Sequence, residues 1–275
     1  MSTSEGPPYP PSEPGPPYPR QSEPSATVAE QLKKAFAPVV AVGVAIVKFG
    51  AILLKVKAFT LVGSVLLSLF VYAQRFGWQF ALGFVVLLLV HEVGHVVLLR
   101  ARGIDAGWPV LIPFMGAFVS MKSAPKSAYD EALSGIAGPV FGTVGAFVTL
   151  LLAEGLDSPL LRVLAYVGFF LNLFNLFPVL PLDGGRTVAA LSPKIWGFGL
   201  LGLLAYEVWR PSPIIPFILL IGSFELYRRW KGRDTEASRA YYALTFAQRR
   251  TIGLSYVGLV VVILWAMHTY PLPPT

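Results

Sequence analysis

Two histidines and a glutamate lie within five residues of one another inside a long apolar run. The run covers residues 78–99 and contains the segment His-Glu-Val-Gly-His at positions 91–95. On a helix, positions four residues apart share a face, so His91 and His95 can present two ring nitrogens to one metal ion. Glu92 lies beside them, where its carboxylate can take a proton from metal-bound water. A structural histidine pair is the alternative, but polar groups inside a membrane are costly, so the pattern favours a catalytic metal site.

A catalytic zinc ion usually has three protein ligands and keeps one position for water. The chain contains no cysteine, and its only other histidine, His268, lies near the far end of the last apolar segment. The third ligand is therefore expected to be a carboxylate. Asp183 is the preferred candidate, because it lies in a Pro- and Gly-rich helix break where an ionised side chain must pair or coordinate. Glu225 is the alternative, although an ion pair with Arg228 or Arg229 explains it more simply.

The composition is that of a protein embedded in a membrane. Of the 275 residues, 55% are hydrophobic and only 13% are charged, and the mean hydropathy is +0.63. Such a chain is too apolar for an ordinary soluble domain. The formal net charge of +7 could suggest nucleic-acid binding. We expect no nucleic acid as a partner, because most basic residues lie at the ends of apolar segments, as the positive-inside rule describes.

The apolar segments predict an all-α polytopic membrane protein with about six to seven transmembrane helices. A stretch from Trp108 to Met121 contains two prolines and a glycine, so it is expected to be a short re-entrant or strand-like segment near the active site. A short turn is expected at residues 74–76, between the first two spans. The expected spans cover residues 58–73, 77–99, 128–152, 158–177, 195–209, 214–227 and 251–267.

Four regions follow from these segments. Residues 1–30 are expected to be a disordered Pro-rich tail, because they cannot bury enough apolar surface to fold. Residues 31–57 predict a basic helix that lies in the membrane interface, with a spanning helix as the alternative. Residues 58–230 form the predicted intramembrane domain, and residues 231–275 a basic linker with a C-terminal transmembrane helix. Lysines and arginines gather on the side of Arg100 and Arg186, which predicts that this side is cytoplasmic.

Several motifs together resemble one known family. The His-Glu-Val-Gly-His segment in an apolar helix is followed much later by Asn175 and by Leu-Asp-Gly at positions 182–184. The glycine spacing at residues 138–142 and the Pro-Phe-Met-Gly-Ala segment at 113–117 also match. From about residue 78 to residue 190, the chain is similar to the site-2 protease family of intramembrane zinc metalloproteases.

The resemblance implies a Zn²⁺ ion held by His91, His95 and Asp183, with Glu92 as general base. It also implies that Asn175 helps to orient or stabilise the scissile carbonyl group. Hydrogen bonding between helices is the alternative role for such an asparagine, and it is the preferred one for Asn172. The expected substrate is the transmembrane segment of another protein, cut within the lipid bilayer near its cytoplasmic side. The chain is thus expected to be a multi-pass protein of the cell membrane.

A transmembrane substrate must unwind before it can be cut, and its freed peptide groups then need hydrogen-bonding partners. The stretch at 112–121 could supply them by strand addition, with Gly116, Ala117 and Phe118 as the substrate-binding positions. A buried loop that only packs the core is the alternative. For the whole protein, the alternatives are a non-catalytic zinc-binding membrane protein and a membrane-anchored peptidase for soluble peptides.

Overall fold

The computed structural model of the chain describes residues 57–113, 116–121, 123–192, 194–212, 214–232 and 234–272. By its contacts the chain divides into two units, residues 1–55 and 56–275, and all described residues belong to the second. The predictions for the Pro-rich tail and for almost all of the basic segment at 31–57 lie outside the described residues.

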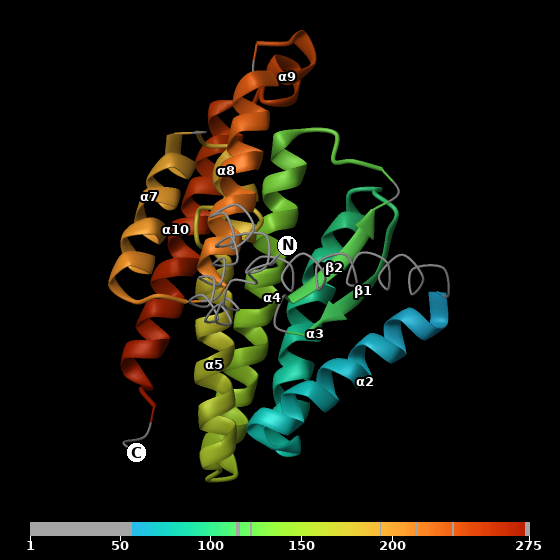
Figure 1. Cartoon of the computed structure of the whole chain (residues 1–275), viewed down its shortest axis with the longest axis vertical. Coiled ribbons are helices and arrows are strands. Elements are labelled where there is room, and N and C mark those ends of the chain that lie inside the picture. The colour runs from blue at the N-terminus through green and yellow to red at the C-terminus, as the bar shows by residue number, and fades with distance from the viewer. Residues whose placement is uncertain are drawn as a thin grey trace, which may run out of the picture. The chain divides into compact units, whose positions relative to one another are not determined.

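The first two helices are joined by a single residue. Helix α2 covers Lys57–Phe76 and helix α3 covers Trp78–Ala101 (Figure 1). Gly77 between them has a φ of 83°, a left-handed conformation that glycine adopts without steric cost. The turn predicted at residues 74–76 was therefore wrong, because these residues continue α2 and the chain reverses at the glycine.

The segment around Trp108 forms a hairpin of two antiparallel strands. Strand β1 covers Ala106–Ile112 and strand β2 covers Gly116–Met121, with Ile112 opposite Gly116 and Val110 opposite Phe118. The hairpin is anchored on α2, because the backbone N–H of Leu111 donates to the Ser64 hydroxyl at 3.1 Å. The Leu111 side chain is buried against residues of α2 and α3, so this part of the chain is held against the helices.

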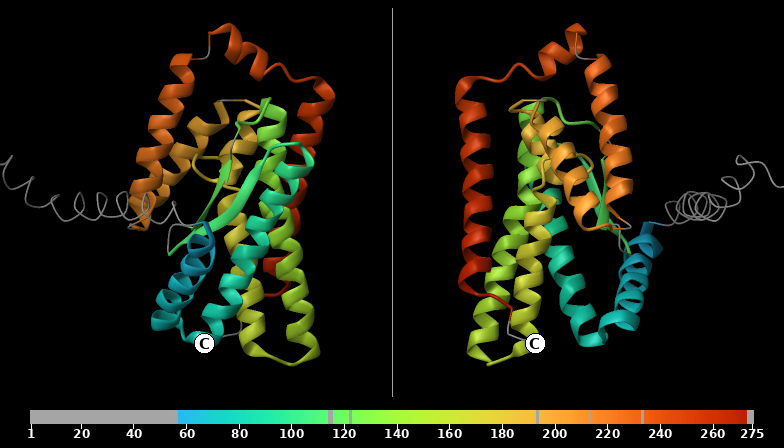
Figure 2. Two further views of the ribbon diagram at one scale, coloured as in Figure 1. Left: turned by 90° about the vertical axis from the view of Figure 1, so that its right-hand side faces the viewer. Right: turned by 60° about the vertical axis from the view of Figure 1, so that its left-hand side comes forward.

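Helices α3, α4 and α5 lie side by side and form the centre of the unit (Figures 1 and 2). Helix α4 covers Ala128–Gly155 and helix α5 covers Pro159–Asn175. Serines cap both helices, since Ser127 accepts a hydrogen bond from the Asp130 N–H and Ser158 from the Leu161 N–H. Small residues allow the close approach: a side chain at Gly94 of α3 would overlap the Ala137 carbonyl oxygen of α4.

The remaining helices follow α5 in the chain. They are α6 (Asp183–Ala189), α7 (Lys194–Trp209), α8 (Ile215–Gly232), α9 (Glu236–Tyr241) and α10 (Phe246–Thr269). Helix α10 contacts α4 and α5, and α9 connects it to α8 (Figure 2). The predicted boundary at residue 230 falls inside α8, and the predicted linker contains α9. A capping box at Thr245 starts α10 five residues earlier than predicted.

Three helices are long and apolar enough to cross a membrane: α3, α4 and α10. The apolar parts of α2 and α5, residues 62–76 and 159–175, are shorter. Large apolar side chains such as Leu151, Phe170 and Leu254 lie exposed on these helices, as expected of surfaces that face lipid. The described structure is thus mostly helical, and the total of six to seven spans stays a prediction.

Candidate active site

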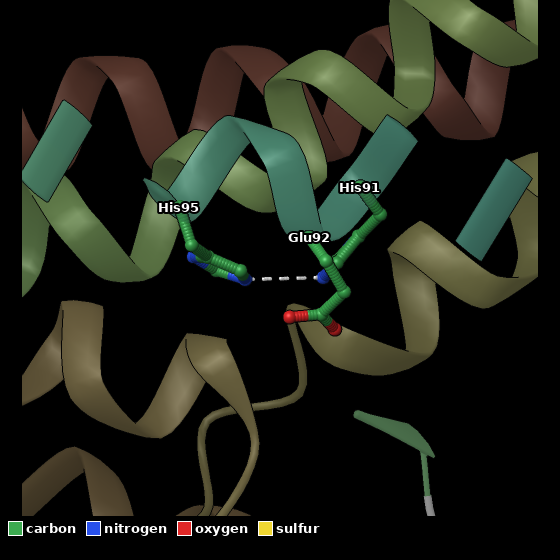
Figure 3. A group of neighbouring side chains, drawn as sticks. All are labelled: His91, Glu92 and His95. Carbon is green, nitrogen blue, oxygen red and sulfur yellow. Dashed lines mark hydrogen bonds between the residues drawn. The ribbon is translucent and has the colours of Figure 1, made fainter. Parts of the chain in front are cut away.

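Helix α3 brings His91, Glu92 and His95 together at its buried side (Figure 3). Their exposed fractions are only 2%, 8% and 6%. The two Nε2 atoms lie 3.2 Å apart, and the donor atoms of all three residues lie within 4.8 Å of one another. Helix α4 packs directly against the two histidine rings because residue 138 is a glycine. A side chain at Gly138 would overlap both rings.

Asp183, the first residue of α6, points at the same two ring nitrogens. Its Oδ2 atom lies 3.0 Å from Nε2 of His91 and 3.2 Å from Nε2 of His95. Helix α6 packs closely against the segment that precedes it, because Gly184 and Gly185 have no side chains. A side chain at Gly184 would overlap the Leu176 backbone, and one at Gly185 would overlap the backbone of Val179 and Leu180. Two imidazoles and one carboxylate therefore meet at one point, and their role as metal ligands stays a prediction.

The spacing of these three atoms fits a zinc ion. Ligands about 2.0–2.1 Å from a tetrahedral zinc ion lie about 3.3 Å from one another. The three separations among the Nε2 atoms of His91 and His95 and the Oδ2 atom of Asp183 are 3.0, 3.2 and 3.2 Å. A metal bound there would have three protein ligands and one open position on the side of the cavity.

The second nitrogen of each ring faces an oxygen acceptor. Nδ1 of His91 lies 2.8 Å from Oδ1 of Asn172, and Nδ1 of His95 lies 2.7 Å from the Ser134 carbonyl oxygen. A carbonyl oxygen can only accept, so Nδ1 of each ring is the donor, and in a neutral ring this leaves the Nε2 lone pair free to bind a metal. The predicted role of Asn172 as a hydrogen-bonding residue between helices is incomplete, because its partner on α3 is one of the metal-site rings.

A cavity of about 480 Å³ opens in front of the site. It is lined by His91, Glu92, His95 and Asp183, and Asn175 also lies on its wall. The Asn175 amide nitrogen donates to the Leu171 carbonyl oxygen at 3.1 Å, one turn earlier in α5. Its carbonyl oxygen or a rotated amide remains available to a ligand in the cavity.

Strand β2 borders this cavity through Val119. Gly116, Ala117 and Phe118 lie earlier on the same strand, where each is paired with a residue of β1. The prediction that these three residues bind substrate stays a prediction.

Glu225, the alternative third ligand, lies on the cavity wall but is engaged elsewhere. Its Oε1 atom pairs with Arg228 at 2.8 Å and with Arg229 at 2.9 Å. Arg229 also pairs with Glu131 at 2.8 Å, and Tyr241 donates its hydroxyl to the same glutamate at 2.9 Å. Burial, reinforced by Glu131, raises the pKa of the Tyr241 phenol, so Tyr241 stays neutral and acts as the donor.

Neither the Ser134 carbonyl contact nor the pairing of Glu131 with Arg229 is predicted from the sequence. A backbone carbonyl such as that of Ser134 leaves no trace in a residue pattern. A Glu and an Arg separated by 98 residues carry no periodic signal that would reveal their pairing.

Residues 79–158 match the model for peptidase family M50, which confirms the resemblance to the site-2 protease family. The chain is 32% identical over 140 residues to "Zinc metalloprotease MJ0392" of Methanocaldococcus jannaschii, covering 49% of this chain and 40% of that protein. It is 37% identical over 112 residues to "Putative zinc metalloprotease Rip3" of Mycobacterium tuberculosis, covering 38% and 28%. It is 30% identical over 162 residues to "Putative zinc metalloprotease sll0528" of a Synechocystis species, covering 53% and 42%. The chain spans less than half the length of these curated relatives.

Proposed function

We propose that the protein is an intramembrane zinc endopeptidase that hydrolyses peptide bonds within or near transmembrane segments of other membrane proteins. The observation that carries the proposal is the convergence of His91, His95 and Asp183 on one point, with Glu92 beside them in the same cavity. The similarity to zinc metalloproteases supports the same chemistry.

In this proposal His91, His95 and Asp183 hold the zinc ion. Bound zinc would supply a Lewis acid that polarises the scissile carbonyl and acidifies a water molecule at the open position. Asn172 and the Ser134 carbonyl keep both rings in the tautomer and orientation that expose the Nε2 lone pairs.

Glu92 acts as the general base. It lies next to His91 on α3 and reaches the cavity in front of the two rings (Figure 3). It accepts the proton of the attacking water and later delivers that proton to the leaving amine. Asn175, on the cavity wall, donates a hydrogen bond to the oxygen of the scissile carbonyl as negative charge develops on it.

The substrate segment is bound in extended form along β2. Val119 of β2 lines the cavity, so a strand added to this hairpin would pass in front of the metal site. The positions Gly116, Ala117 and Phe118 precede Val119 and would pair with the substrate backbone or lie against its side chains. The cytoplasmic side of the membrane is the proposed side of cleavage, because Arg100 in the last turn of α3 and the following Arg102 belong to the side rich in lysine and arginine.

A non-catalytic zinc-binding protein of the same fold is the second candidate. It explains the three ligands but not a buried carboxylate at Glu92 that serves no ion pair among the described residues. The two candidates differ in one experiment: the purified full chain in lipid nanodiscs is incubated with a panel of single-span proteins. Cleavage that disappears in Glu92→Gln supports the endopeptidase, and equal product with both proteins refutes it.

A further inference from the structure

A second cavity, of about 660 Å³, lies away from the metal site. Its walls come from the start of α7, the end of α8, helix α9 and the start of α10, which meet at the same end of the unit (Figure 1). Four cations are among its described lining residues, and no carboxylate is. The four are Lys194, Arg229, Arg239 and Arg249.

Among the described residues, most of this positive charge has no carboxylate partner. Arg229 is the exception, because it pairs with Glu131 and Glu225. Arg249 donates to the carbonyl oxygens of Ala190 and Leu191, both at 2.8 Å, which fixes the guanidinium without cancelling its charge.

Lys194 and Arg239 are exposed. Within the described ranges, neither has a carboxylate at ion-pair distance. A ligand with two or more acidic oxygens could bind several of these cations at once.

The same cavity has an apolar and aromatic side. Trp196 is buried and forms one wall, with its indole N–H donating to the Gly185 carbonyl oxygen at 2.6 Å. The Arg229 guanidinium lies over the Trp196 ring, 5.1 Å from its centroid. Leu226 and Trp230 complete this wall. A ligand that fits must therefore be anionic at one end and apolar at the other.

We propose that this cavity binds the phosphate-bearing headgroup of an anionic phospholipid. The position of the cavity indicates that the phosphate group belongs to a lipid. The cavity lies at the start of the membrane-spanning α10, where Phe246 is 80% exposed. Helix α3 ends toward the same end of the unit, and Arg100 lies in its last turn (Figure 1). Basic cavities between helices at such an interface attract acidic headgroups, while the adjoining apolar surface accommodates the start of the acyl chains.

The headgroup site is physically connected to the metal site. Arg229 lines both cavities, so a bound phosphate competes with Glu131 and Glu225 for its guanidinium. Trp196 contacts Gly185, two residues after Asp183. Occupancy of the site is therefore transmitted to residues that border the catalytic cavity, but the binding itself does not depend on the proposed peptidase activity.

The test measures bound lipid directly. The full chain is delipidated, exposed to an equal mixture of phosphatidylglycerol and phosphatidylcholine, and analysed by native mass spectrometry. We expect one phosphatidylglycerol to stay bound to the wild type. Lys194→Gln/Arg239→Gln should reduce its affinity about twenty-five-fold, since each cation near an anionic lipid contributes about fivefold. The charge-conserving Lys194→Arg/Arg239→Lys should retain it.

The matched control removes two exposed cations elsewhere, Arg75 and Arg210, both to Gln, and should bind the lipid as the wild type does. Equal affinity of the wild type for the two lipids would overturn the proposal, as would equal retention by the Gln double variant. Displacement of the lipid by millimolar inorganic phosphate or glycerol phosphate would assign the site to a soluble anion and overturn the lipid assignment. Thermal unfolding of each variant shows that it is folded, and the lipid comparison on the wild type holds without any variant.

Discussion

The side-chain oxygen of Asn172 on α5 lies 2.8 Å from Nδ1 of His91 on α3. The Asn172 amide is itself oriented, because its nitrogen donates to the Gly168 carbonyl oxygen at 2.7 Å. Only the carbonyl end of the amide can then face the ring, so His91 must carry its proton on Nδ1. A residue on a neighbouring helix thus determines which nitrogen of a ligand histidine is available to metal.

Replacing Asn172 by Leu should weaken zinc binding by about ten- to hundredfold, because the His91 ring loses the group that holds its tautomer and orientation. Gly142→Ala should act in the same direction, since its methyl group would overlap the Asn172 side chain. Zinc affinity is measured by competition with a chelator of known affinity.

Gly258→Ala is the matched control for this prediction. Its methyl group would meet nothing within 4 Å, so zinc affinity should equal that of the wild type. Unchanged affinity in both Asn172→Leu and Gly142→Ala would show that the hydrogen bond does not position His91.

Glu92→Gln should abolish cleavage while keeping the metal. The amide has the shape of the carboxylate but cannot accept the proton of the attacking water, so turnover should fall at least about a hundredfold. Zinc content, measured by elemental analysis of the purified protein, should stay near one equivalent. Turnover equal to the wild type would refute the assignment of Glu92 as the base.

Asp183→Ala should lose both zinc and activity, because two histidines alone make a weak site. Glu225→Ala provides the comparison, since Glu225 is the other carboxylate considered as a ligand and is paired with Arg228 and Arg229. We expect Glu225→Ala to keep its zinc. One tightly bound equivalent in Asp183→Ala would place the third ligand elsewhere.

A proline scan from Gly116 to Ser120 tests β2 as the substrate-binding edge. Proline removes a backbone N–H, so it should abolish cleavage at alternate positions, those whose N–H groups point away from β1. Zinc content and thermal stability should stay near the wild-type values at those positions. Loss of folding at every position, or full activity at every position, would exclude substrate binding by this edge.

The membrane topology predicts different accessibility of the two chain ends. The Pro-rich tail is expected in the cytoplasm and Thr275 outside. The chain has no cysteine, so single cysteines introduced at Ser4 and Thr275 are the only sites for an impermeant thiol reagent. In intact cells we expect labelling at position 275 alone. Labelling at position 4 would show that the basic segment at 31–57 spans the membrane.

The sequence alone determined what depends on local spacing and composition. The four-residue spacing places His91 and His95 on one face of the helix, with Glu92 beside them. The absence of cysteine and the Pro-Gly break around Asp183 were enough to predict a carboxylate ligand. The apolar segments likewise predicted the positions of α3 and α4, because backbone groups in a membrane must be satisfied within a helix.

Only the tertiary structure decided which distant residues meet. Asn172 and Asp183 lie 81 and 92 residues from His91, and their approach depends on how α3, α5 and α6 pack. The pairing of Arg229 with Glu131 arises in the same way, and so does the register of the β1–β2 hairpin. Sequence periodicity indicates which residues share one face of a helix or strand. Which other element packs against that face depends on how the whole chain folds.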